Sequence, residues 1–411
     1  MTLSGAYCGG RPSQCPYTLA SVARTVGIGL VGVGWMGRVH GEAYNRVRYH
    51  YPDCAGVARL VVAADESDSR SGAAVHELGF ERSTAHWRDV VENPEVEAVS
   101  ITVPNDLHLE VATTAASAGK HIWIEKPAGR FPRETAEIAA AVERAGVRSI
   151  VGFNYRHAPA VQRAKQLIDS GSLGTVDHFR SQWVAAYAAS PQGALSWRFR
   201  REKAGLGILG DLGSHAVDLA QFLLGPITSV TARTETVVAE RPLPTGVGTH
   251  FDLIEGGELA PVENEDVVWS IVRFGRGVTG TIEASRVAVG PQARYAFEVH
   301  GSGGAVAWDF ERMNELSVFL PLENGDSGYS RVLMGPQHEP FAHFQPGPGL
   351  PMGYDDLKVI EAALFLESVV DGGQREPGVR EALEAAKVIA AMERSAASGA
   401  WEVVDDLPRA H

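Results

Sequence analysis

Three absences narrow the possible functions of this 411-residue chain. It contains no run of about 18 apolar residues, the length that a membrane-spanning helix needs, so we expect no membrane partner. Lys and Arg number 37 against 50 Asp and Glu, and a net charge of −13 does not favour a nucleic-acid partner. Only three cysteines are present, and they form neither a CxxC pair nor a metal-ligand pattern, which fits the reducing cytoplasm.

The hydrophobic content of 45% is typical of a globular protein. The length predicts two domains, because one domain usually takes about 100–200 residues. From 26 to 155, strands and helices alternate, which is typical of a doubly wound parallel sheet. From 156 to 400, longer strand-like runs follow one another and predict an α/β domain with a large, mostly antiparallel open sheet. We expect residues 1–25 to be a disordered or extraneous tail and residues 401–411 to be a C-terminal tail.

The most informative motif is Gly32-x-Gly34-x-x-Gly37, which follows an apolar strand-like run and precedes a predicted helix. Gly32 allows a tight turn, Gly34 lets the backbone approach a pyrophosphate, and Gly37 permits close packing of helix against strand. The N–H groups at the start of that helix would then bind the phosphates. We therefore predict a dinucleotide site that also includes Trp35 and Met36, and the alternative is an ordinary glycine-rich turn.

A second predicted strand ends in Asp65, and this carboxylate indicates which dinucleotide is bound. At this place a carboxylate accepts hydrogen bonds from both ribose hydroxyls of NAD and repels the additional phosphate of NADP. Arg70 follows shortly afterwards and offers some positive charge to such a phosphate. We expect NAD, with NADP less favoured, and the alternative for Asp65 is a helix cap.

Further strands of the first domain should end at the same edge of the sheet, where ligands of such sheets bind. The side chains that follow these strands are Pro104, Asn105, His108, Glu125, Lys126, Asn154, Tyr155 and Arg156. We expect those at 104–126 to contact the cofactor. Those at 154–156, together with Trp197 and Arg198, combine planar donors with aromatic faces and suit a polyhydroxylated substrate. The alternative is that 154–156 form an ordinary domain seam.

Lys126, Asp211 and His215 have the chemistry of an active site. Lys126 can donate to a substrate oxygen and stabilise a developing alkoxide, unless it is an ordinary surface lysine. A helix would place Asp211 and His215 on one face, where the carboxylate raises the basicity of the imidazole, as a general base requires. Alternatively, His215 packs into a domain interface. We expect no metal site, because no further Cys or His stands at ligand spacing.

These motifs, in this order, resemble the glucose–fructose oxidoreductase/inositol dehydrogenase (Gfo/Idh/MocA) family from about residue 26 to 400. The matching stretches are GVGWMG, the acidic end of the second strand, PNDLH at 104–108, EKP at 125–127, NYR at 154–156 and GDLGSHAVD at 210–218. The resemblance implies NAD(P)-dependent oxidation of a secondary alcohol, with Lys126, Asp211 and His215 as the catalytic residues and His215 as the base. The stretch 196–213, which contains WRF, is most similar to members that act on sugars and glycosides.

We therefore predict an NAD-dependent dehydrogenase that oxidises a ring secondary hydroxyl of a sugar, glycoside or inositol to a ketone. The alternatives are an NAD-dependent glycosidase on the same scaffold, without net redox change, and a non-catalytic NAD-sensing module. A Pro- and Gly-rich excursion at 322–355 could cover the site. The run Val267–Val272 is apolar at both alternations, as in a strand covered on both faces, so we expect a homodimer or homotetramer joined sheet to sheet.

Overall fold

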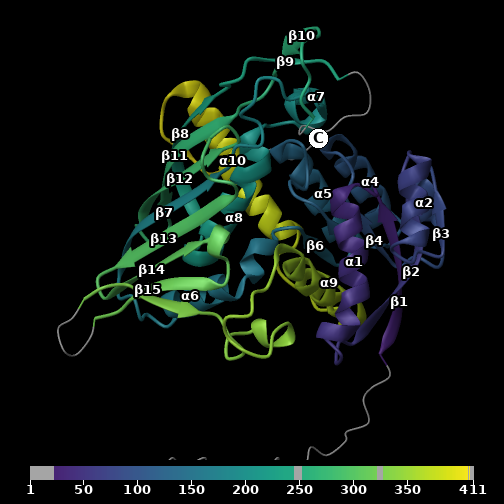
Figure 1. The fold of residues 1–411 in the computed structure, drawn as a ribbon, viewed down its shortest axis with the longest axis horizontal. Coiled ribbons are helices and arrows are strands. Elements are labelled where there is room, and N and C mark those ends of the chain that lie inside the picture. Colours follow the sequence, from purple (N-terminus) through teal and green to yellow (C-terminus); the bar gives the residue numbers. More distant parts are fainter. Residues whose placement is uncertain (1–22, 245–251, 322–326, 406, 408–411) are drawn as a thin grey trace, which may run out of the picture.

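The computed structural model describes residues 23–244, 252–321, 327–405 and 407, and it contains two large sheets (Figure 1). The first sheet has six strands in the order β3-β2-β1-β4-β5-β6, and all its pairs are parallel. The strands are β1 (Arg24–Val31), β2 (Gly56–Ala64), β3 (Arg82–Thr84), β4 (Ala98–Ile101), β5 (His121–Ile124) and β6 (Ser149–Val151). The connecting helices are α1 (Trp35–His50), α2 (Asp68–His76), α3 (Trp87–Glu92), α4 (Asn105–Ser117) and α5 (Pro132–Ala145). The predicted doubly wound parallel sheet is confirmed.

The second sheet has nine strands in the order β16-β15-β14-β13-β7-β12-β11-β8-β17. Only β7 and β12 pair in parallel, so the prediction of a mostly antiparallel sheet is also confirmed. Its strands are β7 (Val176–Val184), β8 (Ile227–Glu235), β11 (Val267–Phe274), β12 (Thr279–Ser285), β13 (Arg294–Gly301), β14 (Gly304–Asp309), β15 (Glu315–Phe319), β16 (Ser330–Leu333) and β17 (Glu402–Val403). A separate hairpin consists of β9 (Glu240–Pro242) and β10 (Leu259–Pro261).

Helices of this second half pack against one face of the nine-stranded sheet. They are α6 (Pro159–Asp169), α8 (Ser214–Leu224) and α10 (Val379–Ser398), and the shorter turns are η1 (Asn154–His157), η2 (Trp197–Phe199), α7 (Arg201–Ala204), η3 (Leu209–Gly213), η4 (Phe310–Arg312) and η5 (Phe341–His343). In β11 the side chains that face the helices, such as Val268 and Val272, are buried, whereas Trp269 and Ile271 are each 43% exposed. Within a single chain, the helices therefore cover only one face of β11, although this strand carries apolar side chains on both faces.

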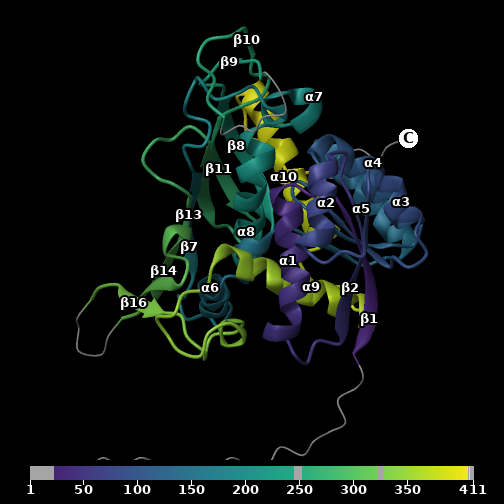
Figure 2. The same cartoon turned by 45° about the vertical axis from the view of Figure 1, so that its right-hand side comes forward.

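The last helices return to the first sheet. Helix α9 (Tyr354–Asp371) lies beside α1 and also contacts β2 (Figures 1 and 2), while α10 contacts α5 as well as β8. The predicted C-terminal tail begins with β17, which pairs with β8, so its first residues belong to the sheet. We keep the domain boundary near residue 155 as a proposal. The expected tail at 1–25 falls almost wholly outside the described residues, among which no helix is long and apolar enough to cross a membrane.

Candidate active site

The glycine-rich loop between β1 and α1 has the close contacts that its motif predicts. Gly32 has a φ of +92°, and a Cβ atom there would lie 2.8 Å from the Thr102 carbonyl oxygen. At Gly37 a Cβ atom would lie 2.0 Å from the Gly32 carbonyl oxygen. At Gly34 nothing lies within 4 Å of that position. The fold therefore requires Gly32 and Gly37, whereas Gly34 leaves its backbone open to an approaching ligand.

Asp65 stands at the end of β2 and is held against the glycine-rich loop. Its Oδ2 accepts a hydrogen bond of 2.8 Å from the Val33 N–H, and its Oδ1 accepts one of 2.9 Å from the Ser67 N–H. Arg70 Nη2 lies 2.7 Å from the same Oδ1. Partial burial alone would raise the pKa of Asp65, but the bonds from Arg70 and the backbone outweigh it and lower the pKa. Arg70 is therefore paired with the carboxylate and is not a free cation.

Lys126, which follows β5, forms an ion pair with Asp211 of η3. Lys126 Nζ lies 2.7 Å from Asp211 Oδ1 and 3.2 Å from the Asp211 carbonyl oxygen. The Tyr187 hydroxyl donates to Asp211 Oδ2 over 2.7 Å. Desolvation alone would raise the pKa of Asp211, but the positive charge of Lys126 outweighs it and holds the pKa far below its usual value. Asp211 is thus an ionised carboxylate at neutral pH, and it can orient the Lys126 ammonium group.

Asp211 raises the pKa of His215, as expected, but other groups and burial outweigh it. Asp211 lies in a π-helical turn, η3, and its carboxylate binds Lys126 and Tyr187. Burial, followed by the charge of Lys126, holds the pKa of His215 well below its usual value, and Asp211 opposes this shift only weakly. His215 is therefore a neutral imidazole at neutral pH, and desolvation rather than a carboxylate partner makes it so.

Aromatic rings connect the glycine-rich loop with His215. The Trp35 ring is 70% exposed and stacks on Tyr354, with centroids 6.0 Å apart. The Tyr354 ring lies 6.1 Å from that of Tyr155, and Tyr155 meets the His215 ring edge-on at 4.8 Å. The Tyr354 hydroxyl also lies 3.9 Å from Met36 Sδ. Tyr354 is the residue of the 322–355 excursion that reaches this cluster, and residues 322–326 lie outside the described residues.

Several of the residues expected to bind a ligand have polar atoms that also bond to protein groups. Arg156 Nε and Nη2 lie 2.7 and 2.6 Å from the buried Asp218 carboxylate. Each His108 ring nitrogen lies 2.9 Å from a main-chain carbonyl oxygen, and the Asn105 amide donates to a third. The Glu125 carboxylate forms a buried ion pair with Lys358 of α9. Arg156 and His108 therefore help to hold the fold together, and their contacts with a ligand stay predictions. Their sequence positions, beside predicted strand ends, do not reveal these distant partners.

The other predicted residues occupy varied surroundings. Pro104 caps the start of α4, and Asn154 is fully buried at the start of η1. Trp197 and Arg198 belong to η2, where the Arg198 guanidinium lies 4.4 Å from the centre of the Trp197 ring. The charge of Arg198 also helps to lower the pKa of Asp211. This pair therefore remains a candidate for substrate contact.

Tyr187 is the site residue that sequence reasoning missed. It follows β7 in a segment without a recognisable motif, and only the tertiary structure brings its hydroxyl to Asp211. Within the described ranges, no three His, Cys, Asp or Glu side chains gather in a way that could hold a metal ion.

Comparison with known proteins assigns both halves of the chain to families. Residues 26–153 match the model of an oxidoreductase family with an NAD-binding Rossmann fold, and residues 161–307 match the Gfo/Idh/MocA C-terminal domain. Levoglucosan dehydrogenase of Pseudarthrobacter phenanthrenivorans is 36% identical, over 92% of this chain and 98% of that protein. Inositol 2-dehydrogenase of Rhizobium meliloti is 28% identical, over 91% of this chain and 97% of that protein.

The fold comparison extends over nearly the whole chain. A solved structure of levoglucosan dehydrogenase in complex with NADH and levoglucosan superimposes with a TM-score of 0.88 at 34% identity. That match covers 93% of this chain and 100% of the solved one. The chain therefore belongs to the Gfo/Idh/MocA family of oxidoreductases, and its first domain is an NAD-binding Rossmann domain.

Proposed function

We propose that this protein is an NAD-dependent dehydrogenase that oxidises a ring secondary hydroxyl of a neutral sugar, glycoside or inositol to a ketone. The observation that carries the proposal is the Lys126–Asp211 ion pair beside the neutral imidazole of His215. An electrophilic ammonium group and a neutral base are the two groups that alcohol oxidation requires. The relatives named levoglucosan dehydrogenase and inositol 2-dehydrogenase support a ring-shaped polyol as substrate.

In the proposed mechanism His215 accepts the proton of the substrate hydroxyl on a ring nitrogen. Lys126 donates a hydrogen bond from Nζ to the same oxygen and stabilises the negative charge that develops there. Asp211 holds Nζ in position and Tyr187 holds the Asp211 carboxylate, so the ammonium group needs little reorganisation during the reaction. Bound NAD supplies the acceptor for the hydride that leaves the substrate carbon.

The aromatic cluster supports a sugar-like ring as the substrate. Successive ring contacts join Trp35, Tyr354, Tyr155 and His215, and Trp197 with Arg198 offers a further aromatic face and a donor. The apolar C–H faces of sugar rings stack on aromatic side chains, and their hydroxyls bind planar donors. We therefore expect neutral rings to be better substrates than acyclic or phosphorylated alcohols.

A substrate panel with NAD tests this function. Levoglucosan, inositols, free pyranoses and methyl glycosides should include compounds that yield NADH and a keto product in equal amounts. Acyclic polyols, 2-hydroxy acids and sugar phosphates are the matched comparison. Turnover of only the comparison set would contradict the sugar assignment but leave the dehydrogenase assignment intact. Cleavage of a glycoside without accumulation of NADH would instead establish the glycosidase alternative.

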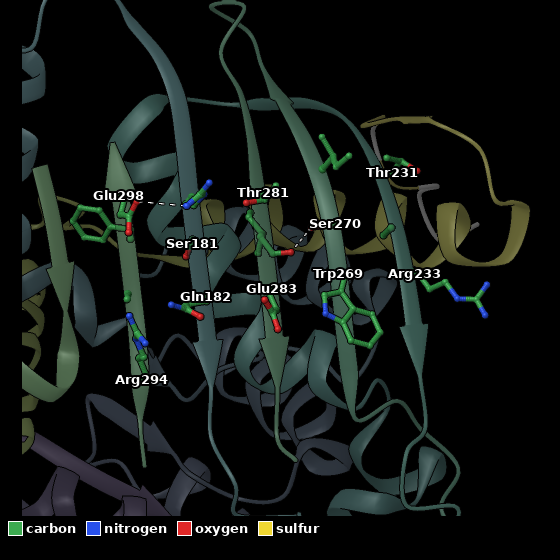
Figure 3. Close-up of a pocket in the computed structure, with 16 residues that line it drawn as sticks. Ser181, Gln182, Thr231, Arg233, Trp269, Ser270, Thr281, Glu283, Arg294 and Glu298 are labelled. Carbon is green, nitrogen blue, oxygen red and sulfur yellow. Dashed lines mark hydrogen bonds and ion pairs between the residues drawn. The ribbon is translucent and has the colours of Figure 1, made fainter. Parts of the chain in front are cut away.

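We also propose that a second copy of the chain covers the open face of the nine-stranded sheet, in a homodimer or homotetramer. A hollow of about 770 Å³ lies on that face, and side chains of β7, β8, β11, β12 and β13 line it (Figure 3). Trp269 and Ile271 of β11 project from this face, and each residue is 43% exposed. Large apolar side chains exposed among polar and charged ones are typical of an interface between protein chains. Light scattering at micromolar concentration should give a multiple of the chain mass, and Trp269→Glu should shift it towards monomer.

We propose a cytoplasmic location for the protein. Cys54, the cysteine among the described residues, is a buried free thiol, which is compatible with a reducing compartment. Fractionation of the producing cells should recover the protein in the cytoplasmic fraction, and recovery outside the cell would contradict this.

A further inference from the structure

A cluster of buried charged side chains lies behind the turn that carries Lys126. Lys358 of α9 is fully buried, and its Nζ lies 2.6 Å from Glu125 Oε1 and 2.8 Å from Glu361 Oε2. His40 of α1 places Nε2 3.1 Å from the same Glu125 oxygen. One ammonium group therefore lies between two carboxyl groups, inside the protein, and the proposed mechanism uses none of these side chains directly.

The two carboxyl groups beside Lys358 differ in pKa. Burial alone would raise the pKa of Glu125, but Lys358 and His40 outweigh it and hold the pKa well below the usual value. For Glu361 burial dominates over the attraction of Lys358 and raises the pKa to about 7. Burial lowers the pKa of His40 to about 4, so the imidazole is neutral at pH 7. Glu125 is thus the ionised partner of Lys358, and Glu361 holds a proton up to about neutral pH.

Glu125 is the link between this cluster and the proposed active site. It immediately precedes Lys126, and Glu125 Oε2 lies 3.4 Å from the Lys126 main-chain nitrogen, which donates to it. The neighbouring strand end approaches so closely that a Cβ atom at Gly152 would lie 2.6 Å from Glu125 Oε1. The carboxylate is therefore confined by main chain on one side and by Lys358 on another.

Helix α9 brings Lys358 from a distant part of the chain. It follows β16 of the second sheet in sequence, yet it packs beside α1, next to the first sheet (Figure 2). The Lys358–Glu125 pair therefore joins the end of β5 to a helix that comes after eight of the nine strands of the second sheet. Because the pair is buried, it is shielded from salt, and removing one partner leaves an uncompensated charge.

We propose that Glu125 and Lys358 are positioning residues for Lys126: the buried ammonium group fixes the Glu125 carboxylate, and Glu125 fixes the turn that presents Lys126 to Asp211. Glu361 does not position the turn, but when Glu125 is replaced it ionises and balances the charge of Lys358. This inference rests on the proposed role of Lys126 in alcohol oxidation. It also means that Glu125 acts through Lys126 and not as a ligand of the cofactor.

The test is a double-mutant cycle of Glu125→Gln, Glu361→Gln and the combined variant. Glu361→Gln resembles the protonated carboxyl, so kcat, NADH affinity and the Lys126–Asp211 contact should stay at wild-type values. Glu125→Gln should fold, because Glu361 then balances Lys358, but kcat should fall about 10- to 100-fold with NADH affinity unchanged. The combined variant leaves a buried ammonium group without a carboxylate, so its loss of melting temperature should exceed the sum of the single losses.

Thermal melting against pH supplies a readout that packing alone does not move. A carboxyl group whose folded pKa is raised stabilises the fold at low pH and loses that contribution as the pH rises. The melting temperature of wild type minus that of Glu361→Gln should therefore fall between about pH 4.5 and pH 7 and then level off. Lys358 of α9 and Glu125, which follows β5, act on Glu361, and His40 of α1 contacts Glu125; all three are the same in both proteins.

The outcomes separate this inference from the proposed function. Melting, NADH binding and crystal structures need no substrate, so they decide the inference even if no alcohol in the panel is oxidised. In crystals of Glu125→Gln the distance of 2.7 Å between Lys126 Nζ and Asp211 Oδ1 should lengthen, and in Glu361→Gln it should not. Weaker NADH binding by Glu125→Gln with an unaltered Lys126–Asp211 contact would overturn the inference and make Glu125 a cofactor ligand. Additive losses of melting temperature would overturn the shared counter-charge.

Discussion

Replacing Asp65 by Ser should change the cofactor preference of the enzyme. The carboxylate is proposed to accept hydrogen bonds from the ribose of NAD, and charge-assisted bonds contribute about 1.5–3 kcal/mol each. Because backbone N–H groups and Arg70 already share the carboxylate, we expect a net loss for NAD of about 2–3 kcal/mol. That loss corresponds to roughly 30- to 150-fold in kcat/KM.

NADP should gain from the same substitution. The repulsion between the carboxylate and the 2′-phosphate disappears, and Arg70 loses the partner that lies 2.7 Å from its Nη2. Since Arg70 is more than one-third exposed, its contact with phosphate is screened, and we expect a gain of about 1 kcal/mol. The ratio of kcat/KM for NAD to that for NADP should thus fall by roughly 100- to 1,000-fold.

The assay compares kcat/KM for both cofactors with one saturating substrate, and fluorescence titration with NADH and NADPH gives the same comparison without a substrate. Asp65→Ser/Arg70→Ala is the control, because it removes the carboxylate without providing a free guanidinium group. The reasoning fails if wild type prefers NADP, or if Asp65→Ser leaves NAD affinity unchanged. An equal gain for NADP in the control would show that Arg70 does not bind the phosphate.

The remaining predictions concern the catalytic residues and the glycine-rich loop. Lys126→Met and His215→Ala should each lower kcat by at least about 100-fold while NADH binding stays near wild type, and normal turnover in either would move the chemistry elsewhere. Because burial lowers the pKa of His215, the base stays unprotonated as the pH falls, so the acid limb of the oxidation rate that belongs to His215 should lie well below pH 6.5. Tyr187→Phe should lower kcat about 10-fold without altering NADH affinity, because one of the two bonds that hold the carboxylate beside Lys126 is lost, and unchanged kcat would contradict this role. Gly37→Ala should destabilise the fold by about 2–4 kcal/mol in urea unfolding, whereas Gly34→Ala should retain wild-type stability but bind NADH more weakly, since only the first new methyl group meets backbone.

The sequence predicted which strands and helices are present more accurately than it predicted where they begin and end. The alternation of strands and helices expected from residue 26 begins with β1 at Arg24, and the tail expected from residue 401 begins with β17. Both differences occur where the polar end of an element lacks the apolar periodicity by which elements are recognised. The excursion at 322–355 contributes Tyr354 to the ring cluster, whereas Phe344 stacks on His50 at the end of α1.

The sequence by itself determined the class of the two sheets and the glycine-rich loop of the NAD-binding domain. These features follow from local sterics and from the period of apolar residues, as the φ of +92° at Gly32 illustrates. Only the tertiary structure decided which charged groups pair. Arg156 binds Asp218, and Glu125 binds Lys358 from the far end of the chain. A hydrogen bond acts over about 3 Å, so its partner depends on which distant segments pack together, and no local pattern records that.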